Sequence, residues 1–559
     1  MTGQTTTEPI PLQHRLIDCD GIRGSAAIQA PNSRATGAWA LMAAGAMEPM
    51  IASLLHPDAY GHPVQPGGPQ LLETHLSWVL LSGPYAYKLK KPVAFGFVDF
   101  STPERREHAC REELRLNRRL SPQRYLDLVP VYGPSQTASF RPPADAPAAS
   151  NPAAAVIAWA VRMVQFDQSQ LLPAALAAGQ VDEAAIRDLA NRLARFHMHA
   201  ETAAPETPWG HPKAVVQPVL DNLTALADCP AAEAVLPPLA AWIDTQARAL
   251  TPWFEQRQKA GHICECHGDL HLGNMLLGAT GIEVFDALEF SETLRWLDPI
   301  SEMAFLVMDL TVRGRADLAG LLLNCWVEAT GDGAGLRSWA WYSVYRALVR
   351  AKVSWLRLKQ AHLAAAERSR VETDLTRYLT LATDWIQRPP QPLVLMHGLA
   401  GSGKSTMAAR LRCELGATVF RSDVERKRLF GLWGERPKRV LAGELYSQES
   451  SLHLYQITLP ALVEAASSGG LAVVVDACFL KRSERQYMVA LAGRIDIPIQ
   501  IVVCAAPEPT LRQRLLERAA AGKDPSDASV DVLEQQQLWL EPLGQDELGL
   551  VITPAESSN

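Results

Sequence analysis

The sequence predicts a two-domain chain, an α+β domain followed by an α/β domain with a parallel sheet. Three observations predict this order. Residues 71–100 have the pattern of strand, turn and strand, and helical patterns dominate from there to residue 386. Three prolines within residues 387–392 cannot continue a helix and favour an extended linker. Beyond the linker, strands and helices alternate, which is typical of a parallel sheet covered by helices.

The first domain should span residues 46–386, with a small lobe over about 50–167 and a helical large lobe over about 168–386. The turn Ser82-Gly-Pro84 separates its first two strands, and the Ser-Thr-Pro-Glu run at 101–104 supplies a cap and a first-turn proline for a helix. We expect strands at 73–81, 85–93 and 154–166, a Pro/Ala/Ser-rich loop at 140–152, and helices at 105–120, 169–200, 215–260 and 299–386.

The second domain should span residues 393–555. Short apolar runs rich in Val, Ile and Leu are separated here by helix-forming segments. The predicted strands are 393–397, 418–422, 471–475, 500–504 and 548–552, with helices at 404–415 and 442–468.

Composition limits the class of protein. With 559 residues the chain is too long for one ordinary core, and 48% apolar and 20% charged residues are typical of a soluble globular protein. A net charge of −7 argues against a broad basic surface for long nucleic acid. Nine scattered cysteines favour a reducing, cytoplasmic setting, and Cys264-Glu-Cys266 is too tightly spaced for a zinc motif. We expect residues 1–45 to form a disordered leader and no segment to span a membrane; nothing in the sequence indicates the oligomeric state.

A phosphate-binding loop of the form G-x-x-x-x-G-K-[ST] follows the first strand of the second domain. Its glycines let backbone N–H groups surround phosphate oxygens, and the helix behind it adds the positive end of its dipole. Lys404 should reach the β- and γ-phosphates of ATP, and Ser405 should bind Mg²⁺. The predicted ATP-binding residues here are Gly398, Leu399, Ala400, Gly401, Ser402, Gly403, Lys404, Ser405 and Thr406.

The next strand ends in Arg421-Ser-Asp423, and Arg426 follows. This Asp-x-x-Arg resembles the small P-loop kinases, such as gluconate kinase, the zeta-toxin group and polynucleotide 5′-kinases. The resemblance implies that Asp423 binds and deprotonates an acceptor hydroxyl and that Arg421 and Arg426 contact the acceptor or its phosphate. A solvated helix start is the alternative.

Further charged residues follow later strands of this domain. Asp476 ends an apolar strand, where an acid can orient Mg²⁺, although it can equally cap the next helix. Arg485 lies after it, and we expect it to bind the acceptor. In the resembling kinases an Arg-x-x-x-Arg helix forms a lid over the phosphates, which implies that role for Arg514 and Arg518. Each arginine alone is equally explained as a solvated helix face.

The central segment His267-Gly-Asp-Leu-His-Leu-Gly-Asn274 has the form H-G-D-x-x-x-x-N. It resembles the catalytic loop of the aminoglycoside phosphotransferases. The resemblance implies that Asp269 accepts the proton of an attacking hydroxyl and that Asn274 and Asp286 bind Mg²⁺. Histidines that lie in the core or bind a metal are the alternative.

The same resemblance requires a strand lysine paired with a helix glutamate. Lys88 in Ala86-Tyr-Lys88 and Glu113 are the predicted ATP-binding pair, with Lys90 and Glu112 as rivals and an exposed lysine-rich edge as the alternative. An acidic residue, Asp298, should brace the catalytic loop, and residues 163–167 should form the hinge. One feature departs from the protein-kinase pattern, because the turn at 82–84 has a single glycine and no glycine-rich loop covers the phosphates.

Over residues 50–555 the chain resembles bacterial proteins in which an aminoglycoside-phosphotransferase-like domain is fused to a P-loop kinase domain. The resemblance implies a cytoplasmic, bifunctional kinase, with each domain transferring the γ-phosphate of Mg-ATP to a hydroxyl of a small molecule. Three alternatives stay open. They are an ATPase switch, a ligand-binding pseudokinase coupled to a P-loop kinase, and a C-terminal nucleic-acid 5′-end kinase.

Overall fold

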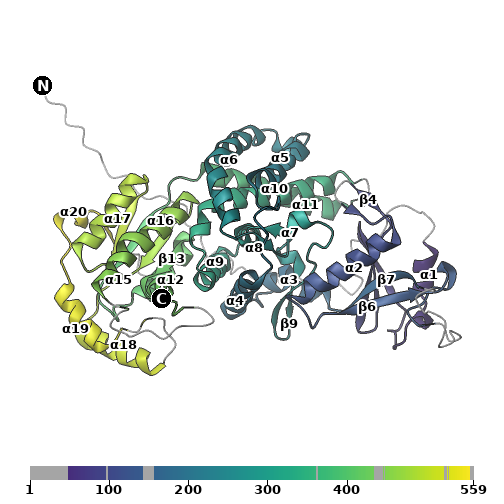
Figure 1. The fold of residues 1–559 in the computed structure, drawn as a ribbon, viewed down its shortest axis with the longest axis horizontal. Helices are drawn as coiled ribbons and strands as arrows, with labels where there is room; N and C mark the ends of the chain where they lie inside the picture. The colour runs from purple at the N-terminus through teal and green to yellow at the C-terminus, as the bar shows by residue number, and fades with distance from the viewer. Residues whose placement is uncertain are drawn as a thin grey trace. The chain divides into compact units, whose positions relative to one another are not determined.

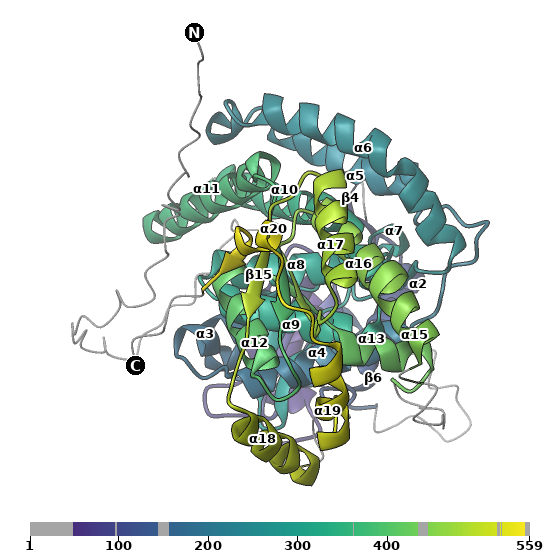
Figure 2. The same ribbon diagram turned by 90° about the vertical axis from the view of Figure 1, so that its left-hand side faces the viewer.

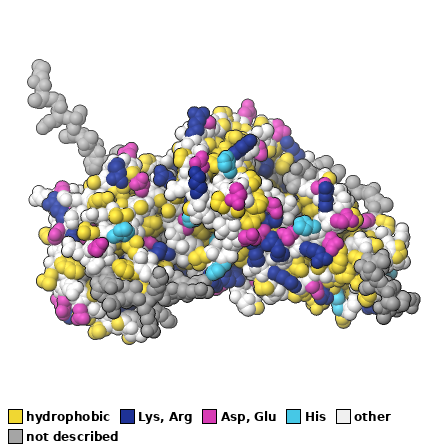
Figure 3. All heavy atoms as spheres, viewed as in Figure 1, with side chains coloured by type: hydrophobic (Ala, Val, Ile, Leu, Met, Phe, Trp, Pro, Cys, Tyr) yellow, Lys and Arg dark blue, Asp and Glu magenta, His cyan; other side chains and the backbone are white. Residues whose placement is uncertain are grey.

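The computed structural model describes residues 48–95, 98–142, 156–360, 363–433, 445, 447–521, 526 and 528–553. The predicted leader at 1–45 and most of the predicted loop at 140–152 lie outside this range. Within it, no helix combines the length and the apolar character that a membrane span requires. On the face drawn in Figure 3, basic and acidic side chains are intermixed over the described residues.

An antiparallel sheet forms the first layered unit. Five strands of the described chain pair in the order β1-β2-β3-β7-β6, and α2 (Pro103–Arg118) packs on β6 and β7 (Figure 1). The Thr102 hydroxyl accepts from the Arg105 N–H and begins α2 where the sequence predicts it. The strands are β1 (Gln70–Glu73), β2 (Ser77–Ser82), β3 (Tyr85–Lys90), β6 (Tyr125–Tyr132) and β7 (Val156–Val164). The prediction missed β6, and it merged the end of β1 with β2.

Helices make up most of the chain from α3 to α11. Helices α10 (Trp339–Leu358) and α11 (Ala365–Gln387) lie side by side in both views (Figures 1 and 2). The others are α3 (Leu172–Ala177), α4 (Glu183–His199), α5 (Pro212–Leu226), α6 (Leu236–Lys259), α7 (Glu292–Arg295), α8 (Pro299–Val312) and α9 (Ala316–Thr330). Small strands among them, β8 (Cys264–Glu265), β9 (Met275–Gly278), β10 (Gly281–Val284) and β11 (Trp296–Leu297), carry the central motif.

A second sheet follows residues 388–392, and its strands are parallel. In the described residues the order is β13-β14-β12-β15-β16. The strands are β12 (Leu393–His397), β13 (Thr418–Arg421), β14 (Val473–Asp476), β15 (Ile499–Val503) and β16 (Val551–Ile552). The helices are α12 (Lys404–Leu415), α13 (Ser422–Leu429), α15 (Gln448–His453), η8 (Leu454–Thr458), α16 (Leu459–Ser468), α17 (Arg482–Arg494), α18 (Glu508–Ala521), α19 (Val530–Trp539) and α20 (Gln545–Leu548). The predicted order of fold classes is confirmed: an α+β part with an antiparallel sheet precedes an α/β part with a parallel sheet.

Helix α9 covers the free edge of the parallel sheet. The Asn324 side chain donates to the Ala417 carbonyl (3.1 Å) and accepts from the Val419 N–H (2.6 Å), so it takes the place of a neighbouring strand beside β13. One buried apolar cluster contains Trp326 and Leu336 on one side and Phe420 and Val463 on the other. The parallel sheet therefore completes its core with residues from the helical part.

Candidate active sites

Strand β3 and helix α2 bring a lysine and a glutamate together in the first fold. Side chains two residues apart share one strand face, so Lys88 and Lys90 both face α2. Lys88 Nζ lies 2.7 Å from a Glu113 carboxylate oxygen and 2.6 Å from Asp286 Oδ1. The predicted Lys88–Glu113 pair is therefore present. Lys90 binds the other Glu113 oxygen (2.5 Å) and also contacts Glu289, while Glu112 pairs with Arg115 at 2.7 Å.

The charges of this cluster fix its protonation. Burial alone would lower the pKa of the Lys88 amine, but Asp286 and Glu113 outweigh it and hold that pKa well above its usual value. Burial would likewise raise the pKa of the Asp286 carboxyl, and the Lys88 charge brings it below the usual value instead. Lys88 and Asp286 are therefore both charged at neutral pH.

A β-hairpin places the two predicted metal ligands near each other. Strands β9 and β10 are antiparallel, with Met275 opposite Val284 at one end and Gly278 opposite Gly281 at the other. Just beyond the first pair, the Phe285 N–H donates to the Asn274 carbonyl (2.9 Å). Asp286 follows with a φ of 66°, a left-handed backbone that is uncommon for a residue other than glycine and that recurs at functional sites. Amide and carboxylate oxygens are suitable Mg²⁺ ligands, so Asn274 and Asp286 fit the predicted ion.

Asp269 lies in the loop before this hairpin and is about one-third exposed (34%). The Asn274 amide donates to its carboxylate (3.0 Å), and His271 Nε2 lies 3.3 Å from the same oxygen. Because the Gly273 N–H donates to His271 Nδ1 (2.9 Å), the proton of a neutral His271 is on Nε2, directed at Asp269. Burial would raise the pKa of Asp269, but His271 outweighs it and the pKa falls well below its usual range. Asp269 is thus an ionised, oriented carboxylate.

The residue that braces this loop is Glu302, and the prediction of Asp298 is wrong. Asp298 caps α8 through the Ile300 N–H (3.0 Å) and binds Arg257 at 2.7 Å. Glu302 lies one helical turn later, is fully buried, and accepts from the Gly268 N–H within the motif. The capping position turns Asp298 toward Arg257, whereas the next turn of α8 faces the loop.

Glu302 also belongs to a buried group with His197 and Cys266, whose ligand atoms lie within 4.8 Å of one another. The indole N–H of Trp326 donates to His197 Nδ1 (3.0 Å), so the His197 proton is on Nε2 and is donated to Glu302 (3.0 Å). A metal on Nε2 would move that proton to Nδ1, against the indole N–H. The group therefore fits a hydrogen-bonded brace and does not fit a metal site.

The phosphate-binding loop has the backbone its sequence predicts. Gly398, Gly401 and Gly403 have φ values of 145°, 80° and 95°, and a Cβ at Gly398 would lie 2.1 Å from the Cys504 carbonyl oxygen. Lys404 begins α12, and its amine donates to the Leu399 carbonyl (2.8 Å), so the side chain folds back over the loop. The loop and the start of α12 together present N–H groups and one cation for phosphate oxygens.

Adjacent parallel strands bring two predicted residues to one edge of the sheet. Arg421 ends β13 and is the register partner of Asp476, the last residue of β14, and their side chains lie 3.5 Å apart. Burial raises the pKa of Asp476 above its usual value, although a hydrogen bond from Ser405 and the Arg421 charge oppose the rise. The hydroxyl of Ser405 and the carboxylate of Asp476 are therefore adjacent and fit a shared Mg²⁺.

A cavity of about 710 Å³ joins these groups to Asp423 and Arg426 on α13. Its volume is within the range of about 300–1,000 Å³ of small-molecule sites. Arg426 is 6% exposed and donates to the Leu445 carbonyl and to the hydroxyls of Ser450 and Ser451, at 3.1–3.3 Å. Thr406 also lines the cavity.

The two lid arginines and a glutamine of α19 border the same cavity. Arg514 donates to the Gly401 carbonyl (3.2 Å) and Arg518 to the Ala528 carbonyl (2.9 Å). Gln536 accepts from the Ala400 N–H (2.7 Å) and so ties α19 to the phosphate-binding loop. No sequence motif marks this residue, because it lies on a helix far along the chain.

The prediction that Arg485 binds the acceptor is wrong. Its side chain is fully buried, pairs with Glu547 (2.7 Å) and donates to the Phe479 and Leu480 carbonyls. All its donors point into the core between α17 and α20. Residues that the prediction missed line the cavity instead, namely Gln448, Ser451, Leu452, Tyr455, Gln456, Lys481, Ser483, Glu484, Gln536 and Trp539.

Comparison with known proteins places the chain in a family. The model of a family described as an AAA domain matches residues 393–543. A Mycobacterium tuberculosis (strain ATCC 25618 / H37Rv) protein, Uncharacterized protein Rv2004c, is 32% identical over 457 residues, which cover 81% of this chain and 86% of that protein. The chain belongs to the same family. A Mycobacterium bovis protein, Uncharacterized protein Mb2027c, matches equally.

The solved structures that match this chain have low sequence identity to it. An amicoumacin kinase in complex with AMP-PNP is 14% identical and covers 61% of this chain and 92% of its own, with a TM-score of 0.37. A choline/ethanolamine kinase family protein from Mesorhizobium loti is 12% identical over 60% of this chain and 97% of its own, with a TM-score of 0.33. Scores this low support no statement on function. The AAA domain and the geometry of both sites support phosphotransferase activity in general.

Proposed function

We propose that the chain is a bifunctional, ATP-dependent phosphotransferase, in which each fold transfers the γ-phosphate of Mg-ATP to a hydroxyl of a small molecule. The observation that carries the proposal is the cavity in which the loop lysine, the Ser405–Asp476 pair and Asp423 meet. A loop that only hydrolyses ATP needs no carboxylate on the acceptor side.

In the P-loop site, phosphoryl transfer depends on position and on neutralised charge. The N–H groups of the loop, Lys404 and Arg514 would face the phosphates, and Mg²⁺ on Ser405 and Asp476 would supply further positive charge. Asp423 would accept the proton of the acceptor hydroxyl and align its oxygen with the phosphorus.

In the kinase-like site, Lys88 held by Glu113 would bind the ATP phosphates, and Asn274 with Asp286 would hold Mg²⁺. Asp269 would orient the second acceptor. Two observations favour this role. The Asp269 carboxylate is ionised, so it can accept a hydrogen bond from a hydroxyl, and its contacts with His271 and Asn274 hold it in a fixed orientation.

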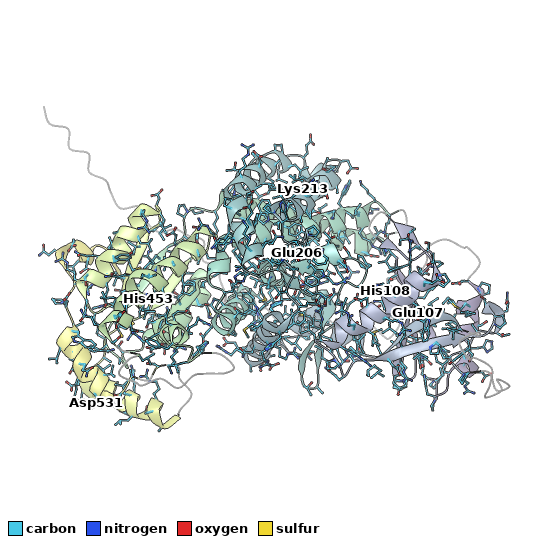
Figure 4. All side chains as sticks on the ribbon, viewed as in Figure 1. Glu107, His108, Glu206, Lys213, His453 and Asp531 are labelled. Atoms are coloured by element: carbon cyan, nitrogen blue, oxygen red, sulfur yellow. The ribbon has the colours of Figure 1, made fainter. Side chains whose placement is uncertain are left out.

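The test is ATP consumption by the full chain, with pooled sugars, nucleosides, aminoglycosides and oligonucleotide ends as acceptors. The variants are Asp269→Asn, Lys404→Ala and Asp423→Asn, with Asp531→Asn on the exposed start of α19 as the matched control (labelled in Figure 4). We expect an acceptor-dependent rate that Asp423→Asn removes and Asp531→Asn leaves unchanged.

Two outcomes would contradict the proposal. If no pool raises the rate above basal hydrolysis and Asp423→Asn leaves hydrolysis intact, the P-loop half is an ATPase switch. If Asp269→Asn changes nothing under any pool, the kinase-like half is a ligand-binding module. Turnover on oligonucleotide ends alone would make the P-loop half a nucleic-acid 5′-end kinase.

A further inference from the structure

Two chemically different groups of residues line the cavity of the P-loop half. One group is the phosphate-binding loop with Arg514 and Arg518. The other group, here named the acceptor end, consists of Gln448, Ser451, Leu452, Tyr455, Gln456, Ser483, Glu484 and Trp539. Its residues come from α15, η8, the start of α17 and the last residue of α19. In Figure 4, His453 marks α15 and Asp531 marks α19.

One helical face supplies five of these residues. Positions 448, 451, 452, 455 and 456 recur at spacings of three and four, which place them on the same side of a helix. Pro460 has no N–H to donate to the Gln456 carbonyl, and the Leu459 N–H donates to the Leu454 carbonyl in a π-helical turn. Such turns recur at functional sites, because the wider turn changes the direction of its side chains.

The cations near the acceptor end are committed to the protein. Arg426 donates to the Leu445 carbonyl and to two serine hydroxyls of α15. Arg421 pairs with Asp476. Lys481 lies 5.7 Å from the centre of the Trp539 ring. If the acceptor already carried a phosphate group, that group would have to compete with these existing contacts for each of the three positive charges.

Apart from Glu484, which accepts from the Lys481 N–H, the polar side chains of the acceptor end are neutral, and Trp539 adds one flat apolar surface. The amides of Gln448 and Gln456 and the hydroxyls of Ser451 and Ser483 each donate and accept hydrogen bonds. Trp539 is 47% exposed although it is a large aromatic residue. An indole face beside several amides and hydroxyls matches a ligand with many hydroxyls around an apolar C–H surface.

We propose that the acceptor of the P-loop half is an uncharged polyhydroxylated molecule, a sugar or polyol, that binds between η8 and Trp539 with one hydroxyl at Asp423. This inference rests on the proposed function and names its substrate class. Gln456 and Trp539 would determine specificity, the first through hydrogen bonds to hydroxyls and the second through contact with the C–H face.

The experiment measures ADP release by the full chain with separate pools of hexoses, pentoses and polyols, sugar phosphates, nucleosides, and oligonucleotide 5′ ends. For the most active acceptor, we expect Gln456→Ala to raise KM about tenfold, the effect of one lost hydrogen bond, while KM for ATP stays within about twofold. Gln513→Ala is the matched control, because Gln513 lies on the exposed side of α18 and binds only Glu517 among the contacts described.

A binding measurement independent of turnover uses tryptophan fluorescence. The acceptor should change the emission of wild type, and Trp539→Phe should remove that change while it keeps most of the affinity, because phenylalanine preserves an aromatic face. Trp539→Ala should lose both. Turnover with sugar phosphates, nucleosides or oligonucleotide ends alone, sensitive to Asp423→Asn, would overturn this inference and leave the proposed function standing. If no pool is turned over, both fail.

Discussion

Replacing Glu302 by glutamine tests whether the brace of the central loop is the hydrogen-bonded chain described above. Its two oxygens accept from the Gly268 N–H and from His197 Nε2, and His197 Nδ1 is occupied by the Trp326 indole. A glutamine has one oxygen and one NH₂ group, so in either orientation an NH₂ group meets another N–H donor. All four groups are buried, and water cannot relieve the conflict.

The expected cost follows from one unsatisfied buried contact, about 1–3 kcal/mol. Urea unfolding of the full chain would measure it, with Glu372→Gln on the exposed face of α11 as the control, expected within about 0.5 kcal/mol of wild type. Removing the indole donor as well, in Glu302→Gln with Trp326→Phe, lets His197 carry its proton on Nδ1 and accept from the glutamine. The double variant should then lose less than the sum of the single losses, by at least about 0.5 kcal/mol. The hydrogen-bonded arrangement of Trp326, His197 and Glu302 would be refuted if Glu302→Gln were as stable as wild type. It would also be refuted if the losses of the two single variants simply added in the double variant.

Three other predictions follow from the P-loop half. Burial raises the pKa of Asp476 above its usual 3.8, so kcat/KM for ATP turnover should fall as the pH decreases, over a range that lies above 3.8, because the carboxylate becomes protonated. Asp476→Asn should remove this pH dependence from the kcat/KM profile. Arg485→Met leaves Glu547 buried without its partner and should destabilise the protein by about 3–5 kcal/mol in thermal unfolding; normal stability with a raised acceptor KM would restore a substrate role. Asn324→Ala should cost about 1–2 kcal/mol and speed hydrogen exchange at residues 417–419, and unchanged exchange would show that the edge needs no cover.

The sequence predicts best where chemistry constrains neighbouring residues. The bounds of β12 and α12 match the prediction because the glycine loop requires a strand before it and a helix after it. The Lys88–Glu113 pair was predictable because a strand places alternate residues on one face. These features depend on a few residues and on backbone geometry alone.

Predictions fail where distant contacts decide. Arg485 has the spacing of a site residue, and only the position of Glu547 more than sixty residues later turns it into the core. Asp298 and Glu302 are both acids at the start of α8, and the rotation of the helix decides which one faces the loop. Strand β6 was missed because its apolar and polar residues do not alternate, and it pairs with β7 across a bulge.

The apolar cluster that α9 shares with the parallel sheet has a consequence for biosynthesis. At about 5–20 residues per second, roughly seven to thirty seconds pass between the completion of α9 and the completion of β14. During that time the apolar face that later meets Phe420 and Val463 has no partner within its own chain. The emerging polypeptide thus passes through an interval in which a chaperone would have a defined surface to protect.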